Sequence, residues 1–470
     1  MRSTLLILLA GFSLHGVRVF GADMQMAPDM QMPPGMQMSP GTQMGPVPGA
    51  APQSSMQKPA PPAAGGTTLG ELESLALKNN PTLVESQAQI AGERGKALQA
   101  GLFPNPALGY VGDLLGVKHA PLGEFEGGML GQEVILGGKL KYSRKKYQAR
   151  VSAAEQQATA QQLRVLNDVR ILYYRVMAAR ERLVLKQELL KTAKDRWLTT
   201  HEMRNQGQAN QADVHSANID LEKHKAETIM FENELALAWQ QLTTVIGITR
   251  EYGLLDGNLL YAPAEVAWDP LWKKLLADSP ELGEAKMKLR ADELTVQREK
   301  RQMIPNLVLC GGAGYDQIDK SFAARAGVTV TNIPLFNRNQ GTIQQAEADL
   351  RRQHAQVKLV ELDLRRRLAY QYWRYKTAAQ FVKSYHEVIV PEARARYEVV
   401  LRSYMDTRLE WPAVLEAQKG YADARLQYID HLLACREADI ELGGFLLTGG
   451  LIAPPGVTPP GHIDATPQPR

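Results

Sequence analysis

The methionine thioethers are the side chains with the clearest potential for chemistry in this sequence. Eight of the 16 methionines lie between Met24 and Met56, and most stand in Met-x-Met pairs separated by a polar residue. Thioether sulfur is a soft ligand suited to Cu(I) and, by extension, Ag(I), and such pairs on a flexible chain can gather three sulfurs around one ion. The candidate ligands are Met24, Met26, Met30, Met32, Met36, Met38 and Met44.

The segment that carries these methionines also fits a low-complexity spacer. Ten of the 27 prolines lie between Pro28 and Pro62, and six more follow Leu447. Proline-rich segments without periodicity cannot bury enough surface to fold. We therefore expect a disordered arm over residues 22–66 and a disordered tail over residues 448–470. Transient Cu(I) or Ag(I) capture and a plain spacer both stay open for the arm, and no resident cofactor is expected.

Catalytic motifs are missing from the sequence. The nine histidines are scattered, and it has no His-Glu-x-x-His pattern, Gly-rich phosphate loop or Gly-x-Ser-x-Gly turn. With 44% hydrophobic residues and a net charge of +4, the 470-residue chain has material for a sizeable core and no strong basic bias. We expect neither an enzyme nor a nucleic-acid-binding protein.

Residues 1–21 have the features of a secretory signal peptide. Arg2 precedes a short apolar run, and small residues stand at the expected cleavage site. The run is too short to be a retained membrane anchor. Because the only cysteines are Cys310 and Cys435, we expect export without an N-terminal lipid.

The longest uninterrupted pattern runs from Lys139 to Gln206, 68 residues without Gly or Pro. As one helix it would be roughly 100 Å long. Apolar residues form two seams, one through Val165 and Val169 and one through Ile171, with charged residues between them that we expect to face water. Two seams fit a helix standing in a ring of helices, whereas a long two-stranded coiled coil is the alternative.

The folded part repeats itself with an offset near 200 residues. Asn80-Pro81 returns as Ser279-Pro280, and Pro104-Asn105 returns as Pro305-Asn306. Each copy predicts a short helix, a helix of about 23 residues, two strands, a long helix and, after a turn, a helix of about 37 residues. We therefore expect a pseudo-symmetric architecture. Its parts are a first repeat (residues 67–248), an inter-repeat segment (249–270) and a second repeat (271–447).

The Gly-rich segments of each copy are the expected strands. In the second copy, residues 307–315 and 322–331 alternate apolar with small or polar side chains, as in a strand between lipid and a wet lumen, whereas the first copy alternates poorly. Four strands per chain cannot close a barrel, and an open edge cannot sit in hydrocarbon. Three copies would supply twelve strands.

With these marks the sequence resembles the TolC family of outer-membrane channel proteins over Thr67 to Leu447. The resemblance is carried by Asn80-Pro81, by Pro104-Asn105 and by Gly137-Gly138 before the long helix. It implies a mainly α fold with membrane β-strands. Three chains would form a twelve-stranded barrel in outer-membrane lipid, a periplasmic α-barrel and an equatorial girdle. It also implies docking on a periplasmic adaptor and an inner-membrane pump.

The resemblance further implies a gate at the periplasmic tip. Asp213 matches the family's tip aspartate, and Tyr404 matches the tyrosine with which it pairs across helices. Glu416 falls where the family often has an acid that faces the entrance. The gate arginine of the family is replaced by Leu409, with Arg408 beside it, so an arginine link is in question.

The leading hypothesis is therefore a passive outer-membrane exit duct for copper, silver or other metal ions. A type I secretion or drug-efflux duct would use the same scaffold. A periplasmic metal-binding coiled-coil scaffold is the alternative from another class, and it predicts release from envelopes without detergent.

Overall fold

The computed structural model describes residues 66–113, 125–249, 253–260, 262–406, 411–457 and 462. The chain divides into two units, Met1–Pro61 and Pro62–Arg470, and all described residues belong to the second. The methionine arm lies outside the described residues. In the first repeat the elements are α1 (Leu69–Asn79), α2 (Pro81–Gln99), β1 (Ala107–Asp113), β2 (Phe125–Val134), α3 (Lys139–Asn205) and α4 (Gln211–Ile246).

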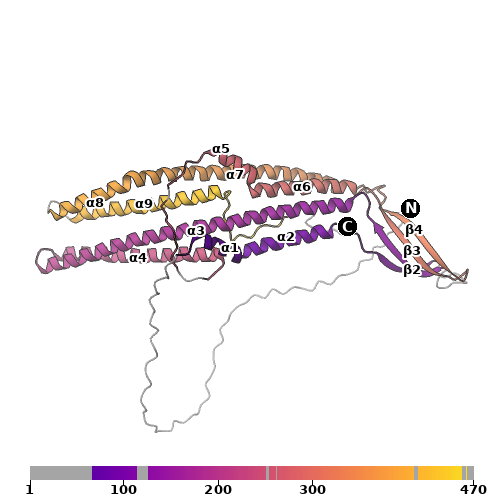
Figure 1. Ribbon diagram of the computed structural model, residues 1–470, viewed down its shortest axis with the longest axis horizontal. Coiled ribbons are helices and arrows are strands. Elements are labelled where there is room, and N and C mark those ends of the chain that lie inside the picture. Colours follow the sequence, from indigo (N-terminus) through magenta and orange to yellow (C-terminus); the bar gives the residue numbers. More distant parts are fainter. Residues whose placement is uncertain are drawn as a thin grey trace, which may run out of the picture. The chain divides into compact units, whose positions relative to one another are not determined.

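The second repeat has the same order of elements. They are α5 (Trp268–Asp278), α6 (Pro280–Arg301), β3 (Asn306–Asp316), β4 (Ser321–Thr331), α7 (Gln340–Ser384), the π-helical turn η1 (Tyr385–Ile389), α8 (Val390–Met405) and α9 (Trp411–Gly443). Two shorter helices, α2 and α4, lie along the one continuous helix α3 (Figure 1). The long counterpart helix is interrupted by η1, which ends two residues before Pro391, and this proline lacks a backbone donor.

Local signals explain where these helices begin. Asn80 caps α2 because its Oδ1 accepts the Thr82 N–H at 3.0 Å, and Pro81 occupies the first helical position. The Asn80 amide also donates to the Val245 carbonyl at 2.8 Å, which ties the start of α2 to the end of α4. No described helix is long and apolar enough to cross a membrane.

The four strands form one antiparallel sheet in the order β1-β2-β3-β4, at the end of the helices from which α3 and α7 start (Figure 1). Tyr110 pairs with Gly128, Gly128 with Ala313 and Ala313 with Ala324. One sheet face exposes large apolar side chains, among them Leu108, Tyr110, Phe322 and Val328. The other face carries the Arg325–Asp113 ion pair.

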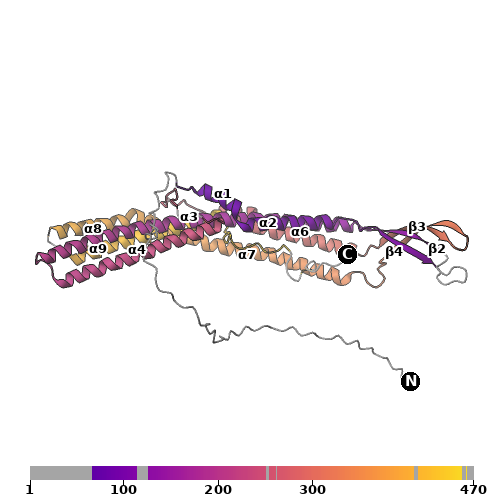
Figure 2. The same cartoon turned by 90° about the horizontal axis from the view of Figure 1, so that it is seen from below.

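The hydrophobic core lies midway along the helices. One buried cluster joins α1, α3 and α4 around Val169 and Leu242, and a second joins α6, α7 and α9 around Leu282, Leu368 and Leu432. Both clusters include α3 residues, because α3 packs on α2 and α4 of its own repeat and on α6 and α9 of the second (Figure 2). The two faces of α3 thus hold the two repeats together.

The segment after α9 differs from the expected disordered tail. The Asp168 carboxylate accepts the Gly450 N–H at 2.6 Å, Val457 is 3% exposed, and His462 is buried, with its Nε2 3.0 Å from Asp292 Oδ1. Residues 448–457 and 462 therefore belong to the folded unit, and the expectation of a tail that is disordered from residue 448 is wrong for them. The proline-rich composition of this segment suggested disorder. Composition cannot show that the segment has binding partners, because these partners are far away in the sequence.

The charged residues between the two seams of α3 were expected to face water, but several of them contact other segments instead. Arg164 pairs with Glu281 at 3.0 Å, and Arg175 pairs with Glu437 at 2.7 Å. Asp168 accepts hydrogen bonds from the tail, and burial raises its pKa despite these bonds. These side chains thus connect α3 to other segments.

Candidate functional site

The candidate site lies at the end of the helices opposite the sheet (Figure 1). There the α3–α4 turn runs through Gly207, whose φ of 76° favours glycine, and Gln208 N donates to Met203 O at 2.8 Å. Helix α8 ends and α9 begins at this same end of the helices (Figure 1), and residues 407–410 between them are outside the described part of the chain. Every predicted gate residue belongs to these two turns or to the helices that flank them.

Asp213 forms a capping box at the start of α4. Its carboxylate accepts the Asn210 N–H at 3.0 Å, and the Asn210 side-chain oxygen accepts the Asp213 N–H at 2.9 Å. Asp213 is exposed, so the same carboxylate has room for a second partner. In the described residues it makes no hydrogen bond to Tyr404, and the predicted pairing stays a prediction.

Tyr404 instead belongs to a cluster that the sequence analysis missed. Its ring meets Trp411 edge-on with centroids 5.0 Å apart, and the Arg196 guanidinium lies over the Trp411 ring at 5.4 Å. Arg196 also pairs with Asp220 of α4. Arg196 therefore links α3, α4 and α9 next to the turns. The signal available in the sequence was a Trp directly after the turn, but its partner Arg196 lies on α3, far away in the sequence.

Glu416 is exposed on α9 and accepts a hydrogen bond from Arg396 of α8 at 3.1 Å. This ion pair joins the two helices of the second tip hairpin. Arg408 lies outside the described residues, as do the seven candidate methionine ligands. Within the described ranges, no three His, Cys, Asp or Glu side chains gather closely enough to hold a metal ion.

Further ion pairs connect the tip helices above a small cavity. Lys186 of α3 donates to Glu227 of α4 at 2.9 Å. Partial burial opposes the charge of Glu227, but the bond from Lys186 and the charges of Lys186 and His224 outweigh it, so the pKa of Glu227 lies below its ordinary value. A cavity of about 240 Å³ between α3, α4 and α9 is lined by these groups and by Arg196 and Trp411.

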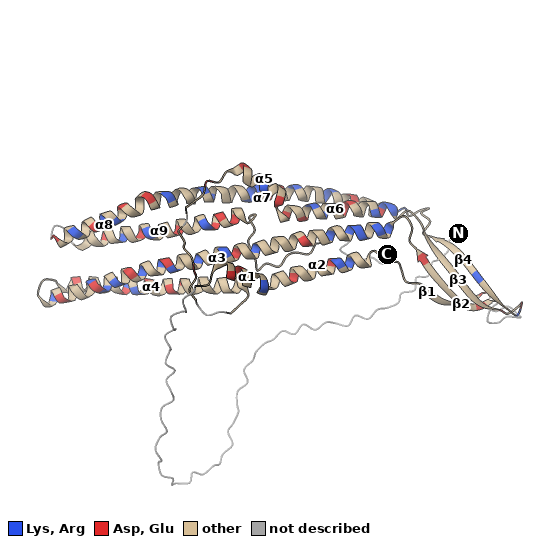
Figure 3. Ribbon diagram, viewed as in Figure 1, with Lys and Arg blue, Asp and Glu red and all other residues tan. Residues whose placement is uncertain are grey.

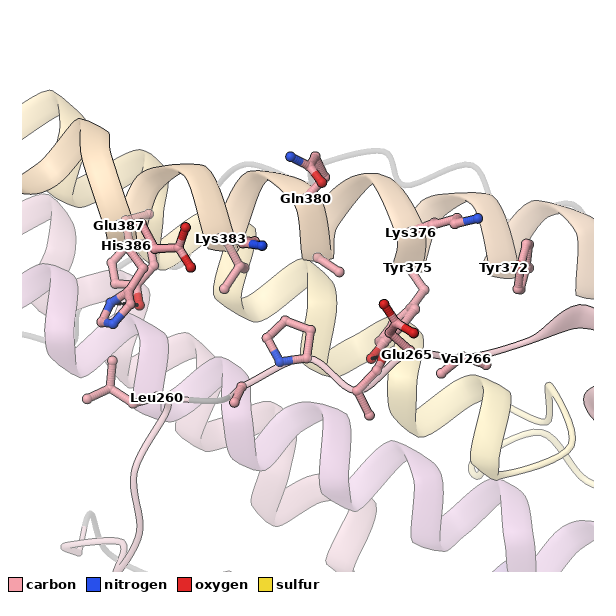
Figure 4. Close-up of a pocket in the computed structure, with 16 residues that line it drawn as sticks. Leu260, Glu265, Val266, Tyr372, Tyr375, Lys376, Gln380, Lys383, His386 and Glu387 are labelled. Atoms are coloured by element: carbon pink, nitrogen blue, oxygen red, sulfur yellow. Dashed lines mark hydrogen bonds between the residues drawn. The ribbon is translucent and has the colours of Figure 1, made fainter.

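A larger hollow of about 870 Å³ lies between the inter-repeat segment and α7 (Figure 4). Tyr375 extends from α7 toward this segment, where its hydroxyl donates to Ala264 O at 2.8 Å, whereas Gln380 points away from it. At the other end His386 of η1 lies 3.1 Å from the Tyr428 hydroxyl. The hollow marks where the inter-repeat segment crosses the helices.

The cysteines are not paired with each other. Cys310 is partly exposed on β3, and Cys435 is buried in α9, where burial raises the pKa of its thiol to about 12. A thiol with such a pKa is unreactive near neutral pH.

Comparison with known proteins decides the family. Residues 72–248 and 271–446 each match the family described as outer membrane efflux protein, once per repeat. The chain belongs to this family. The matched ranges fall within the two repeats, and the resemblance to TolC-like channels is confirmed. Members of the family are transport ducts without enzymatic activity or cofactors.

Similar proteins include a metal-resistance protein, a probable outer-membrane lipoprotein and several channels of solved structure. The cobalt-zinc-cadmium resistance protein CzcC of Cupriavidus metallidurans is 24% identical, over 78% of this chain and 87% of its own length. The probable outer membrane lipoprotein SilC of Salmonella typhimurium is 24% identical, over 60% of this chain and 64% of its own. The solved structure of CusC has a TM-score of 0.67 at 17% identity, over 81% of this chain and 92% of CusC, and shows the same fold.

Proposed function

We propose that three copies of this chain form the outer-membrane exit duct of a tripartite efflux system. The single observation that carries the proposal is that the outermost elements of one copy are uncovered on both sides. The edge strands β1 and β4 each lack a partner strand on their outer side among the described residues, and α7 on one side and α2 with α4 on the other expose apolar side chains. Substrates would be handed over by a periplasmic adaptor and an inner-membrane pump, and they would leave passively.

The sheet supports this assembly. Its outer strands β1 and β4 each have one side with no partner strand in the described chain, and a membrane does not tolerate such edges. If β1 of one copy pairs with β4 of the next, both edges disappear. Three copies of the four-stranded sheet give twelve strands, which exceeds the roughly eight of the smallest closed membrane barrels.

The helices support the same arrangement through the internal repeat. In the first repeat, α3 packs on α6 and α9 of the second repeat, but its counterpart α7 packs mainly on elements of its own repeat. The open surface of α7 exposes Leu359, Leu362, Tyr370 and Trp373. Helices α2 and α4 are the first-repeat counterparts of α6 and α9, so α7 would pack on α2 and α4 of the next copy. The apolar side chains exposed there are Val84, Ile219, Ile229 and Leu237. Such a head-to-tail contact closes into a ring.

Asp213, Tyr404, Arg408 and Glu416 would form the gate of this ring. The supporting observation is that the two tip hairpins are linked by the Arg196–Trp411 contact and by exposed ion pairs such as Arg425–Glu188. Exposed ion pairs are weak and reversible. An adaptor that competes for these groups would separate the hairpins and open the duct.

Metal ions are the proposed cargo, with Cu(I) and Ag(I) first. Met24 to Met44 supply soft sulfur ligands on the arm, and a similar protein is named for cobalt, zinc and cadmium resistance. Residues 1–21 would be a cleaved signal peptide, residues 22–66 the metal-capturing arm, and residues 67–248 and 271–447 the two repeats of the duct around the segment 249–270.

Membrane extraction and mass measurement test the duct. We expect the protein in outer-membrane fractions, released only by detergent, with the mass of three chains. Release by salt or alkali alone as a monomer would favour the soluble scaffold.

Deletion of residues 22–66 tests whether the arm captures the proposed metal cargo. Cells should lose tolerance to copper and silver salts but keep their tolerance to organic drugs, while the trimer still assembles. Unchanged copper and silver tolerance would count against the arm as a metal-capturing segment.

A further inference from the structure

A dense group of cations lies where α3 leaves the sheet (Figure 3). Residues 139–150 contain six basic residues and no acidic residue, namely Lys139, Lys141, Arg144, Lys145, Lys146 and Arg150. Cations at a helix N-terminus are unfavourable because they face the positive end of the helix dipole. The matching residues 340–351 of α7 contain a single basic residue, Arg351, and carry Glu347 and Asp349. The fold therefore does not require this charge, since the second repeat forms without it.

The six cations divide between two sides of α3. Lys139 is 5% exposed and its Nζ donates to Asn306 Oδ1 at 2.6 Å, while Asn306 Nδ2 donates to Glu133 Oε1 at 2.7 Å. By strand alternation, Asn306 and Glu133 lie on the same sheet face as Arg325, which is the polar face. Lys146 and Arg150 are also buried. This side of the helix faces the polar side of the sheet and the tail.

The other three cations point away from that side. Lys141, Arg144 and Lys145 follow a spacing of three and four residues, so they share one face of α3. All three are exposed, and none forms an ion pair within the described chain. They therefore lie on the side of α3 opposite the buried cations, and no ion-pair partner from the described residues neutralises them.

Apolar side chains accompany these free cations. Arg144 lies against the end of α2, since a Cβ on Gly101 would be 3.1 Å from Arg144 Cδ. The next residues, Leu102 and Phe103, are 51% and 62% exposed. Free cations beside exposed aromatic and aliphatic side chains are typical of proteins at a membrane surface. The flanks of α3 itself are covered by α2 and α6 of the same chain.

We propose that Lys141, Arg144 and Lys145 bind the phosphate groups of anionic phospholipids in the leaflet that faces the helices. Leu102 and Phe103 would enter the acyl region beside them. The inference rests on the proposed function, because it requires the sheet to span the outer membrane. Charge decides the occupant, since guanidinium and ammonium groups recognise phosphate oxygens and three unpaired cations favour an anionic headgroup over a zwitterionic one.

Spin-labelled lipids test the proposal on the full-length protein in vesicles of phosphatidylcholine. The measured quantity is the fraction of spin-labelled phosphatidylglycerol or phosphatidylcholine that the protein immobilises. We expect the wild-type protein to prefer phosphatidylglycerol by about threefold, and the K141Q/R144Q/K145Q variant to lower this ratio toward one. High salt should have the same effect on the wild-type protein, because it screens exposed charges without any risk to folding.

The matched control is K191Q/K194Q/R204Q, which removes three exposed cations without ion pairs from the far end of the same helix. It should keep the wild-type preference. A preference that survives both the junction substitutions and high salt would overturn the proposal. If the wild-type protein immobilised neither lipid, the membrane-spanning sheet itself would be wrong, and the two failures are thereby distinguished.

Discussion

The middle of the helices and their tip are built on different principles. The equatorial region, where α1, α5 and residues 253–260 meet the long helices, is held by two buried apolar clusters. In the tip region, which comprises residues 186–230, α8 and the first half of α9, no residue of α8 is buried and ion pairs join the helices. A part that opens needs weak, reversible contacts, whereas the part that holds it needs a packed core.

The largest effect is expected from emptying the equatorial core. Leu72 of α1 is 2% exposed within the first cluster, and Leu72→Ala should lower the free energy of unfolding by about 2–5 kcal/mol because it leaves a cavity. The matched control is Leu77→Ala on the same helix, where Leu77 is 43% exposed and the cost should be below about 1 kcal/mol. Denaturant unfolding in detergent measures both. Equal losses would show that α1 is not held by that cluster.

A smaller effect is expected from detaching the tail. Asn167 is fully buried, and its amide donates to Gly444 O at 2.9 Å and to Leu447 O at 2.7 Å. Asn167→Ala removes both bonds and leaves the Leu447 carbonyl without this donor, which should lower the free energy of unfolding by about 1–3 kcal/mol. Limited proteolysis should then cut after residue 447, whereas the exposed control Gln162→Ala stays resistant. Resistance in both variants would contradict the role of Asn167.

Arg196→Ala should act on the tip alone. It removes the pair with Asp220 and the contact over Trp411, at a cost of about 1 kcal/mol or less. Hydrogen exchange should accelerate at residues 193–206 and 211–222 and stay unchanged around Val169. Arg180→Ala, which removes an exposed arginine without an ion pair in the described chain, is the control. Acceleration at the equator as well would mean that the two regions are one cooperative unit.

The smallest effect concerns pH. The pKa of Glu227 lies below its ordinary value of 4.5, so its ionised form stabilises the tip at higher pH, and this contribution is lost as the pH falls below 4.5 through the folded-state pKa. Protection factors of the tip amides should therefore fall in acid, and Glu227→Gln should reduce that dependence. The exposed control Glu222→Gln should leave it intact. A tip whose protection is independent of pH in both proteins would contradict the role of the Lys186 pair.

Much of the scaffold follows from the sequence because its signals are local. The long run without Gly or Pro predicted α3 to within one residue, and Asn80-Pro81 predicted the start of α2. The structure adds what depends on distant partners. Asp168 accepts a hydrogen bond from the tail although about 280 residues separate the two in the sequence, and composition cannot reveal such a contact. The same reason hid the Arg196–Trp411 contact, whereas Asp213 was found because its turn has a local pattern.

Ion conductance in planar lipid bilayers tests the central claim most directly. If the protein is a trimeric duct closed at the tip, the wild-type protein should pass a small, stable current. Arg196→Ala should raise this conductance several-fold, and Arg180→Ala should not change it. A trimer that inserts but passes no current in any variant would contradict the duct, and equal conductance in all three proteins would contradict a gate at the tip.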